Sequence, residues 1–506
     1  MEMLNLVLWF LSTCVLAIAL TKSFSRGTKA AGSDLPPGPS PFAVIGNLLE
    51  LGDKPHNSLA KLSHIYGPIM SLKFGQVTTI VISSGAMAKE ILQNYDTSFY
   101  NRPIPDALQA HQHSDFAMVW LPVSTPWRNL RKICNSHIFS IQKLDASQDL
   151  RRKEIQQLLA YVKESCCAGK AIDISQVAFN ASLNFLSKTM FSVDLADPSS
   201  DAGREFKQIV RGVMVEAGKP NLGDYFPMLR KLDLQGRRRR MTTYFGKMLE
   251  IFDLMIDQRL NLRQEHGLTD AESRDMLDTL LNTSEENSNQ IDKNSIKHLF
   301  VELFAAGTET TSSTLEWAMT EVIRKPEALL KAKLEIEETI GKGKPVEESD
   351  VIRLPYLQAV VKETFRLHPP APLLLPRKAS EDVTISGFTV PKGAQIFVNA
   401  WAIGRDASTW DNPNSFMPER FLESDIDVKG RHFELIPFGG GRRICPGLPL
   451  AIRMLYPMLG SLINSFDWKL EDGVTPENMD MEEKFGITLR KAKPLRLVPT
   501  FAVSNI

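Results

Sequence analysis

The sequence predicts a mainly α-helical protein with a smaller β region, folded as one large domain. Leucine-rich stretches with helical spacing run through residues 150–191, 205–217 and 236–260, whereas β-rich runs are short and few. A length of 506 residues would by itself suggest about three ordinary domains, but no Ser- or Gly-rich linker divides the body of the chain. We therefore expect a single helical body with one extended core.

The N-terminus carries a candidate membrane segment. Leu4–Leu20 is a run of 17 mostly apolar residues, at the short end of what spans a bilayer as a helix. A cleaved signal peptide is the alternative, but the small-residue cleavage pattern is weak. Because Glu2 precedes the run whereas Lys22 and Arg26 follow it, the positive-inside rule predicts an uncleaved anchor with the body in the cytosol.

A proline-rich stretch, Leu35–Pro41, follows the basic residues and predicts a stiff, extended hinge, because proline fixes φ and removes a hydrogen-bond donor. The expected organisation is an N-terminal anchor at 1–21, a basic and proline-rich hinge at 22–41, and one domain at 42–506.

Charge and cysteine content exclude several classes of protein. Lysine plus arginine equals aspartate plus glutamate, 59 against 59, so no overall charge favours binding to nucleic acid. The five cysteines are odd in number and lack CxxC or zinc spacing, which excludes a disulfide framework. This cysteine usage fits a reducing compartment.

The first part of the body predicts a hairpin followed by a helix and a loop. Two β-rich runs within Pro68–Ile82 flank a Gly-Gln turn, and a helix is expected around Ala86–Gln93. Asn101–Trp120 has prolines and aromatic residues without a clean period, so we expect a loop. His111 and His113 resemble a metal-binding pair, but two spaced histidines on a loop are more often exposed, and we expect these to face solvent.

Two helices carry candidate functional side chains. Helical spacing places Trp127 and Arg131 on one face, where an indole N–H and a guanidinium suit a buried carboxylate; an ordinary helix salt bridge is the alternative. A long apolar helix is expected from Asn294 to about Ile323. It contains AGTETT at 306–311, whose glycine and threonines weaken the hydrogen-bond ladder, so a local bend could admit dioxygen. Glu309 and Thr310 there supply an acid and an alcohol for proton transfer; a solvent-facing glutamate is the alternative.

Further along the chain, Glu363 and Arg366 are helical neighbours at spacing i, i+3. Pro369–Pro376 is an apolar, non-helical run that could form the wall of a pocket. Val383–Val390 predicts a hairpin around Ser-Gly, and 396–399 predicts another strand.

The stretch FGGGRRICPG at 438–447 places one cysteine, Cys445, in a rigid turn. Its three consecutive glycines allow a tight fold and a close approach to a flat ligand, and Leu448–Phe466 after it is an apolar segment. A thiolate is a soft ligand for iron and, as an axial haem ligand, favours cleavage of an O–O bond. The alternative is that Cys445 is simply a buried small hydrophobic residue.

Phe438, Gly441, Arg443, Cys445 and Gly447 match the FxxGxRxCxG signature of the cytochrome P450 family, and the chain resembles that family over essentially everything after Leu35. The (A/G)Gx(D/E)T, ExxR and WxxxR motifs occur as well, in the family's order. The resemblance implies the cytochrome P450 fold and haem b with Cys445 as the axial iron ligand. One departure is Glu309, where the family's usual residue is aspartate.

The resemblance also implies roles for other residues. In the catalytic group it places Glu309 as an acid relay and Thr310 as the hydroxyl near bound oxygen. In the cofactor-binding group it places Trp127, Arg131 and Arg377 at the haem propionates, with Phe438, Arg443 and Gly447 around the thiolate. In the structural group it places Glu363, Arg366 and Arg420 in one buried charge network. In the substrate pocket it suggests Ala305, Ala306, Leu373, Leu374 and Ile487.

A finer resemblance is to plant microsomal monooxygenases that act on terpenoids, among them the geraniol 8-hydroxylases. It rests on stretches such as VMVEAGKPNLGDYFP and DMEEKFGITL. It implies hydroxylation of a monoterpenol such as geraniol at its terminal allylic methyl, with linalool or an abietane diterpene as alternative substrates. It also implies anchorage in the endoplasmic reticulum membrane, contact with membrane lipid, and the use of dioxygen.

Electrons must come from a partner, because the chain has no GxGxxG unit or flavin segment. The resemblance implies that this partner is an NADPH-cytochrome P450 reductase. Two other classes remain as alternatives: a reductase-independent haem-thiolate isomerase or dehydratase, and a non-catalytic haem carrier or sensor. Neither would need the acid–alcohol pair of Glu309 and Thr310.

Overall fold

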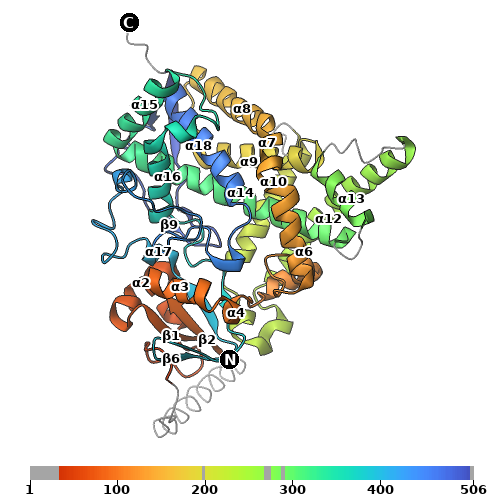
Figure 1. Ribbon diagram of the computed structural model, residues 1–506, viewed down its shortest axis with the longest axis vertical. Helices are drawn as coiled ribbons and strands as arrows, with labels where there is room; N and C mark the ends of the chain where they lie inside the picture. Colours follow the sequence, from red (N-terminus) through yellow and green to blue (C-terminus); the bar gives the residue numbers. More distant parts are fainter. Residues whose placement is uncertain (1–33, 196–199, 267–274, 287–290, 502–506) are drawn as a thin grey trace, which may run out of the picture.

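The computed structural model describes residues 34–195, 200–266, 275–286 and 291–501. Helices dominate and the strands form small sheets, which confirms the prediction of a mainly helical fold with a smaller β region (Figure 1). The predicted anchor, 1–21, and residues 22–33 of the predicted hinge lie outside the described residues. Within the part of the chain that is described, no helix combines the length and apolar character needed to cross a membrane.

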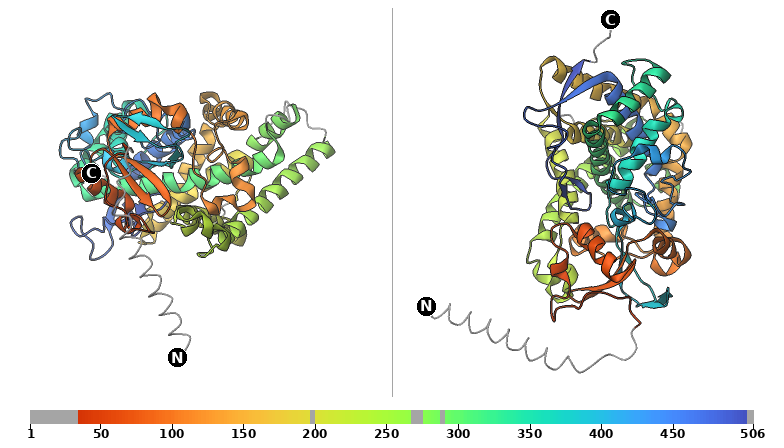
Figure 2. Two further views of the ribbon diagram at one scale, coloured as in Figure 1. Left: turned by 90° about the horizontal axis from the view of Figure 1, so that it is seen from below. Right: turned by 90° about the vertical axis from the view of Figure 1, so that its left-hand side faces the viewer.

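The α-helices occupy most of the body. The shorter ones are α2 (Pro55–Tyr66), α3 (Gly85–Lys89), α4 (Asp96–Phe99), α5 (His113–Phe116), α6 (Thr125–Ile133), α7 (Ile141–Ala146), α11 (Leu222–Tyr225), α13 (Met276–Glu286), α15 (Pro326–Ile340), α16 (Pro355–Leu367) and α17 (Ala400–Ile403). The longer ones are α8 (Gln148–Cys167), α9 (Ile174–Phe191), α10 (Asp201–Gly218), α12 (Arg237–His266), α14 (Lys293–Arg324) and α18 (Leu448–Ser465). Helices α12 and α13 extend to one side of the body (Figures 1 and 2).

The largest sheet lies at one end of the molecule, away from α8, α15 and α18 (Figures 1 and 2). Its strand order is β1-β2-β7-β4, made of β1 (Ile69–Phe74), β2 (Val77–Ile82), β7 (Gln395–Val398) and β4 (Arg377–Lys378). The predicted hairpin is confirmed, because β1 and β2 pair antiparallel, and Gly75 in its turn has a positive φ of 58°.

Three smaller sheets complete the β region. The predicted second hairpin is confirmed by the antiparallel pair β5 (Val383–Ile385) and β6 (Phe388–Val390). The other two sheets are β9 (Glu483–Lys484) with β10 (Arg490–Lys491), and β3 (Ile172–Asp173), β11 (Arg496–Phe501) and β8 (Phe466–Leu470) in the order β3-β11-β8.

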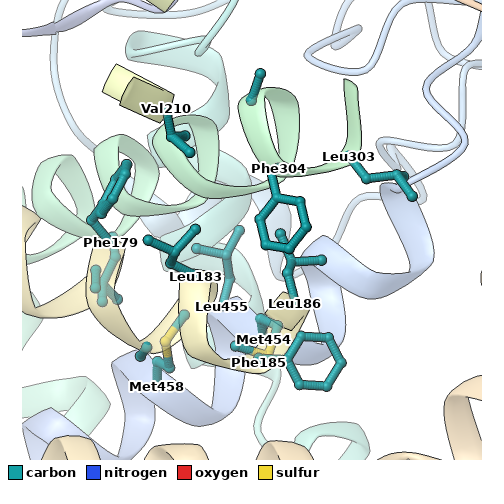
Figure 3. Close-up of a cluster of buried hydrophobic side chains, with 14 of the residues drawn as sticks. Phe179, Leu183, Phe185, Leu186, Val210, Leu303, Phe304, Met454, Leu455 and Met458 are labelled. Carbon is teal, nitrogen blue, oxygen red and sulfur yellow. The ribbon is translucent and has the colours of Figure 1, made fainter. Parts of the chain in front are cut away.

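Helix α14 runs through the centre of the body. The Asp292 side chain caps its N-terminus by accepting a hydrogen bond from the Ser295 N–H, and most of its length is buried. Apolar side chains of α9, α14 and α18, such as Leu186, Phe304 and Leu455, gather in one core (Figure 3). Burial of this kind is the main favourable contribution to folding, so α14 is a rigid base for the side chains that it carries.

The loop predicted for Asn101–Trp120 is wrong in part. It contains a 3₁₀ helix, Asp106–Gln112, followed by the helical turn α5. His113 is buried rather than exposed, and its Nδ1 lies 2.8 Å from Nδ1 of His298 on α14. His111 is exposed as predicted. The prediction is wrong for His113 because this segment packs against α12 and α14, a tertiary contact that local composition does not encode.

Candidate active site

The turn around Cys445 has a backbone that only glycine fits well. Gly441 has a φ of 66°, and a Cβ there would lie 1.9 Å from the carbonyl oxygen of Leu92. The Cys445 N–H donates to the Phe438 carbonyl at 3.0 Å, which closes the turn. Helix α18 begins directly after it, at Leu448.

The surroundings of the Cys445 thiol act on its pKa in opposite directions. Burial raises the pKa, whereas the backbone N–H groups of Gly447 and Leu448 and the charge of Arg131 lower it. Although protein surrounds the thiol, its side chain has accessible surface, and so does Ala306 on an otherwise buried stretch of α14. Accessible surface on both enclosed segments fits a flat group held between them.

Helix α6 packs against this turn. Arg131 donates from Nη1 to the Ile444 carbonyl at 2.6 Å. The guanidinium carbon of Arg443 lies 5.0 Å from the centre of the Trp127 ring, a cation–π distance. Arg128 and Lys132 are exposed. The two faces of α6 are therefore different, one against the cysteine turn and the other toward solvent.

A buried cluster of arginines lies next to the cysteine turn. Arg377 donates to the Gly440 carbonyl at 2.9 Å and to Asp96 at 3.3 Å. In Arg102, Nε and Nη1 are buried without a hydrogen-bond partner among the described residues. Burial lowers the pKa of Arg102 well below its usual value, and the charges of Arg443 and Arg377 lower it further. A buried cation with unpaired donors is costly, so this cluster suits an anionic ligand such as the haem propionates.

Glu302 and Arg443 hold the end of the 101–120 segment from two sides. On α14, the Glu302 carboxylate accepts the N–H groups of Met118 and Val119 at 2.9 and 2.8 Å. Arg443 donates to the carbonyl oxygens of the same two residues at 3.0 and 3.3 Å. Burial raises the pKa of Glu302 to about 8, opposed by those two N–H groups. We call this arrangement the backbone clamp.

Glu363, Arg366 and Arg420 lie together at the C-terminal end of α16 and in the segment after it. Arg366 forms a two-point pair with Glu363, with both N–O distances 2.7 Å. Arg420 Nε reaches the same carboxylate at 3.1 Å, and the Met417 N–H donates to it at 2.7 Å. Arg366 also donates to the carbonyls of Gly404, Pro413 and Ser415, so this network ties α16 to the chain before the cysteine turn.

The acid and the alcohol of the central helix have different partners. Glu309 is 4% exposed, and its Oε1 lies 2.6 Å from Nη1 of Arg490 on β10. Burial raises the pKa of Glu309, and the charges of Arg490 and Arg211 lower it. Thr310 is half-buried and donates to the Ala306 carbonyl at 2.7 Å, a bond to the preceding turn that helix threonines can form. Helix α14 nevertheless continues without a break through this turn.

The residues suggested for the pocket are not all in one environment. Ala305 is buried, and Ala306 beside it is exposed. Leu373 is buried in a separate cluster with strands β1 and β2, and the partly buried Leu374 packs on the neighbouring cluster of the large sheet. Ile487 packs on the main core.

Comparison with known proteins identifies the family. The profile described as "Cytochrome P450" matches residues 36–497. The chain belongs to the cytochrome P450 family. The family named from the FxxGxRxCxG motif is thereby confirmed, and the chain is a cytochrome P450 monooxygenase. Membership implies a haem-thiolate cofactor, and the accessible cysteine turn and the unpaired arginine donors fit that group.

Its relatives include plant enzymes of similar length. The chain is 56% identical to a geraniol 8-hydroxylase of Swertia mussotii over 99% of both chains, and 54% identical to a geraniol 8-hydroxylase of Catharanthus roseus over 99% of this chain and 100% of that enzyme. It is 53% identical to a drimenol monooxygenase of Persicaria hydropiper over 98% and 97%. Among solved structures, a zebra fish cytochrome P450 with progesterone has a TM-score of 0.75 at 27% identity, covering 88% of this chain and 99% of that one.

Sequence reasoning missed three charged residues of this cytochrome P450 site. Arg102, Glu302 and Arg490 each act across a long separation in the chain, with partners on other elements. The only signal for Glu302 was a carboxylate within an apolar helix, and neither Arg102 nor Arg490 stands in a motif or periodic pattern that marks it out.

Proposed function

We propose that this cytochrome P450 hydroxylates a small hydrophobic terpenoid, and that the substrate is a monoterpenol such as geraniol, oxidised at its terminal allylic methyl. The observation that supports this most strongly is full-length identity above half to two enzymes named geraniol 8-hydroxylase. A second candidate is another terpenoid alcohol, because the drimenol monooxygenase is 53% identical. Linalool and abietane diterpenes are further candidates of the same kind.

In this proposal, haem b is held by the Cys445 thiolate, with Trp127, Arg131, Arg377 and Arg102 toward its propionates. Bound in this way, haem supplies the activation of dioxygen that a hydroxylation requires. Phe438, Gly441 and Gly447 shape the turn, and Arg443 fixes it to the neighbouring loop through backbone carbonyls.

Glu309 and Thr310 are proposed to move protons toward the reacting oxygen. Glu309 is buried but contacts the partly exposed Arg490, so its carboxyl lies at the boundary between solvent and the protein interior. Thr310 is half-buried one residue later and carries a hydroxyl that can exchange its present bond to Ala306 for another. Burial raises the pKa of the Glu309 carboxyl, which favours the protonated form that a general acid needs.

The proposed setting is the endoplasmic reticulum membrane, with the anchor at 1–21, the hinge at 22–41 and the domain at 42–506 on the cytosolic side. Large exposed apolar residues near the hinge and in the segment after α11 support a lipid contact: Phe42, Val44, Leu49, Met228, Leu232 and Leu234. The turn of the β1–β2 hairpin contacts both regions, since the Gly75 N–H donates to the Ile45 carbonyl at 3.1 Å and the Gln76 N–H donates to the Tyr225 carbonyl at 3.0 Å.

Electrons are proposed to come from an NADPH-cytochrome P450 reductase in the same membrane. Arg128 and Lys132, exposed on the side of α6 away from the cysteine turn, could form part of a basic docking surface. Charge reversal at both positions should slow electron transfer and reduce its dependence on salt. Unchanged rates and salt dependence would exclude these two residues from the docking surface.

The function is tested with membranes that contain this protein and a plant reductase. NADPH-dependent turnover of geraniol is measured beside nerol, linalool and an abietane diterpene, with product positions assigned by mass spectrometry. The expected product is a terminal allylic diol from geraniol. If geraniol gives no product while the ferrous–CO spectrum shows intact thiolate-ligated haem, the substrate is a different compound. Turnover that needs no NADPH would instead support an isomerase or dehydratase.

A further inference from the structure

The C-terminal hairpin β9–β10 reaches the central helix beside the proposed oxygen-binding turn. Ser313 of α14 donates to the Leu489 carbonyl at 2.6 Å, and the Leu489 N–H donates to the Pro370 carbonyl at 2.8 Å. The next residue, Arg490, pairs with Glu309 at 2.6 Å. The acid that sequence reasoning selected is therefore held by a residue 181 positions further along the chain.

This pair lies at a boundary between interior and solvent. Glu309 has a 6% exposed side chain, whereas the side chain of Arg490 is 30% exposed. The contact is close but poorly aligned, because Oε1 of Glu309 is buried and accepts no hydrogen bond from the described residues. The Glu309 carboxylate is therefore held by charge and lacks the aligned hydrogen bond that would strengthen the pair.

The other charged groups near Glu309 come from several elements. Arg211 on α10 acts on Glu309 in the same direction as Arg490, and both oppose the effect of burial. Glu316 lies further along α14. Burial, aided by Asp173, raises its pKa to about 7 against the Leu495 N–H, Lys491 and Arg490, which lower it. Arg490 thus acts on both Glu309 and Glu316, and it is in direct contact with Glu309.

The hairpin is fixed firmly enough for Arg490 to keep its place. On β9, Glu483 stands opposite Lys491, lies 2.8 Å from Nε2 of His56 and accepts a hydrogen bond from the Trp401 indole at 3.1 Å. The turn between the strands carries Ile487, whose backbone nitrogen would lie 2.3 Å from a Cβ on Gly218 at the end of α10. The same hairpin therefore touches both α10 and the proposed acid.

We propose that Arg490 is a positioning residue for the monooxygenase reaction, holding the Glu309 carboxylate on the solvent side of α14 until it turns inward with a proton. This inference rests on the proposed proton-relay role of Glu309. The additional methylene of glutamate, compared with the family's aspartate, provides the reach between β10 and the interior. Removing the Arg490 charge should leave Glu309 protonated up to higher pH, because an opposite charge favours the ionised form.

The test uses full-length protein in membranes with a plant reductase, and it needs no identified substrate. NADPH consumption and hydrogen peroxide release are measured across pH, because reduction of dioxygen to water consumes more protons than reduction to peroxide. The variants are Arg490→Gln, Arg490→Lys and Glu309→Gln, with Lys484→Gln as the matched control. Lys484 is exposed and pairs with Arg490 in the strand register, so its substitution removes a positive charge from the same hairpin.

In Arg490→Gln, the pH at which water formation gives way to peroxide should rise by about one unit or more, the shift expected from an opposite charge at this distance. Arg490→Lys should fall between Arg490→Gln and the wild type, Lys484→Gln should match the wild type, and Glu309→Gln should lose the transition. A ferrous–CO spectrum and haem content equal to wild type show that the fold is intact. If Arg490→Gln loses haem, the proposal is judged by Arg490→Lys instead, which should show a transition at higher pH than the wild type.

Two outcomes distinguish the role of Arg490 from the role of Glu309. The role of Arg490 would be overturned, and that of Glu309 kept, if Glu309→Gln loses the transition while Arg490→Gln keeps the wild-type transition. If Arg490→Gln has lost its haem, the same comparison is made with Arg490→Lys. A wild-type transition in Glu309→Gln would overturn the relay role and the role of Arg490 together.

Discussion

Replacement of Glu363 by alanine should cost the protein most of its stability and its haem. Glu363 has no exposed surface, and its carboxylate receives two hydrogen bonds from Arg366, one from Arg420 and one from the Met417 backbone. Alanine would leave the Arg366 guanidinium buried without a counter-charge. Breaking a buried pair from one side costs about 3–5 kcal/mol, a large share of the ~5–15 kcal/mol that stabilises an ordinary folded protein.

The assay compares haem content, the ferrous–CO spectrum and thermal unfolding by circular dichroism. Glu205→Ala is the matched control, because Glu205 forms an exposed ion pair with Lys247. Loss of an exposed pair should cost less than about 1 kcal/mol, so this control should keep its haem. Wild-type haem content and melting temperature in Glu363→Ala would refute the reasoning that the buried network maintains the fold.

Two further substitutions test the haem contacts and the backbone clamp. Arg102→Leu should release haem to apomyoglobin about tenfold faster or more, since a hydrogen bond between charged groups contributes about 1.5–3 kcal/mol; Arg128→Leu is the exposed control, and equal release rates in both would exclude a contact between Arg102 and a haem propionate. Glu302 has a pKa raised in the folded state, so its contribution to stability is present at low pH and declines as pH rises from 4.5 to about 8. Thermal unfolding of Glu302→Gln should lack that part of the slope, and a slope equal to wild type would show that Glu302 does not titrate in this range.

Periodicity predicted the helices and hairpins because their patterns are local. Apolar spacing located the central helix as 294–323, within one residue of α14 at each end. The Gly-Gln and Ser-Gly turns marked both hairpins correctly, since a turn's chemistry lies within a few residues. The fold class could be predicted for the same reason.

Contacts across the fold could not be predicted in this way. His113 was expected to face solvent, yet it is buried against His298, 185 residues later. Arg102 stands out only because the fold brings it close to Arg443 and Arg377, and a sequence pattern does not show which distant residues become neighbours. Arg490 becomes the partner of Glu309 only when the C-terminal hairpin packs against α14, so the sequence alone could not identify the pair.

The backbone clamp has a consequence for how well the segment that it holds can tolerate mutation. Glu302 and Arg443 form hydrogen bonds with the backbone N–H and C=O groups of Met118 and Val119, and these bonds do not involve the two side chains. Mutations at these two positions can therefore change the side chains of the segment without removing these four hydrogen bonds. Relatives that are each more than half identical to this chain carry names as different as geraniol 8-hydroxylase and drimenol monooxygenase, and a segment supported through its backbone can change its side chains while these supports are kept.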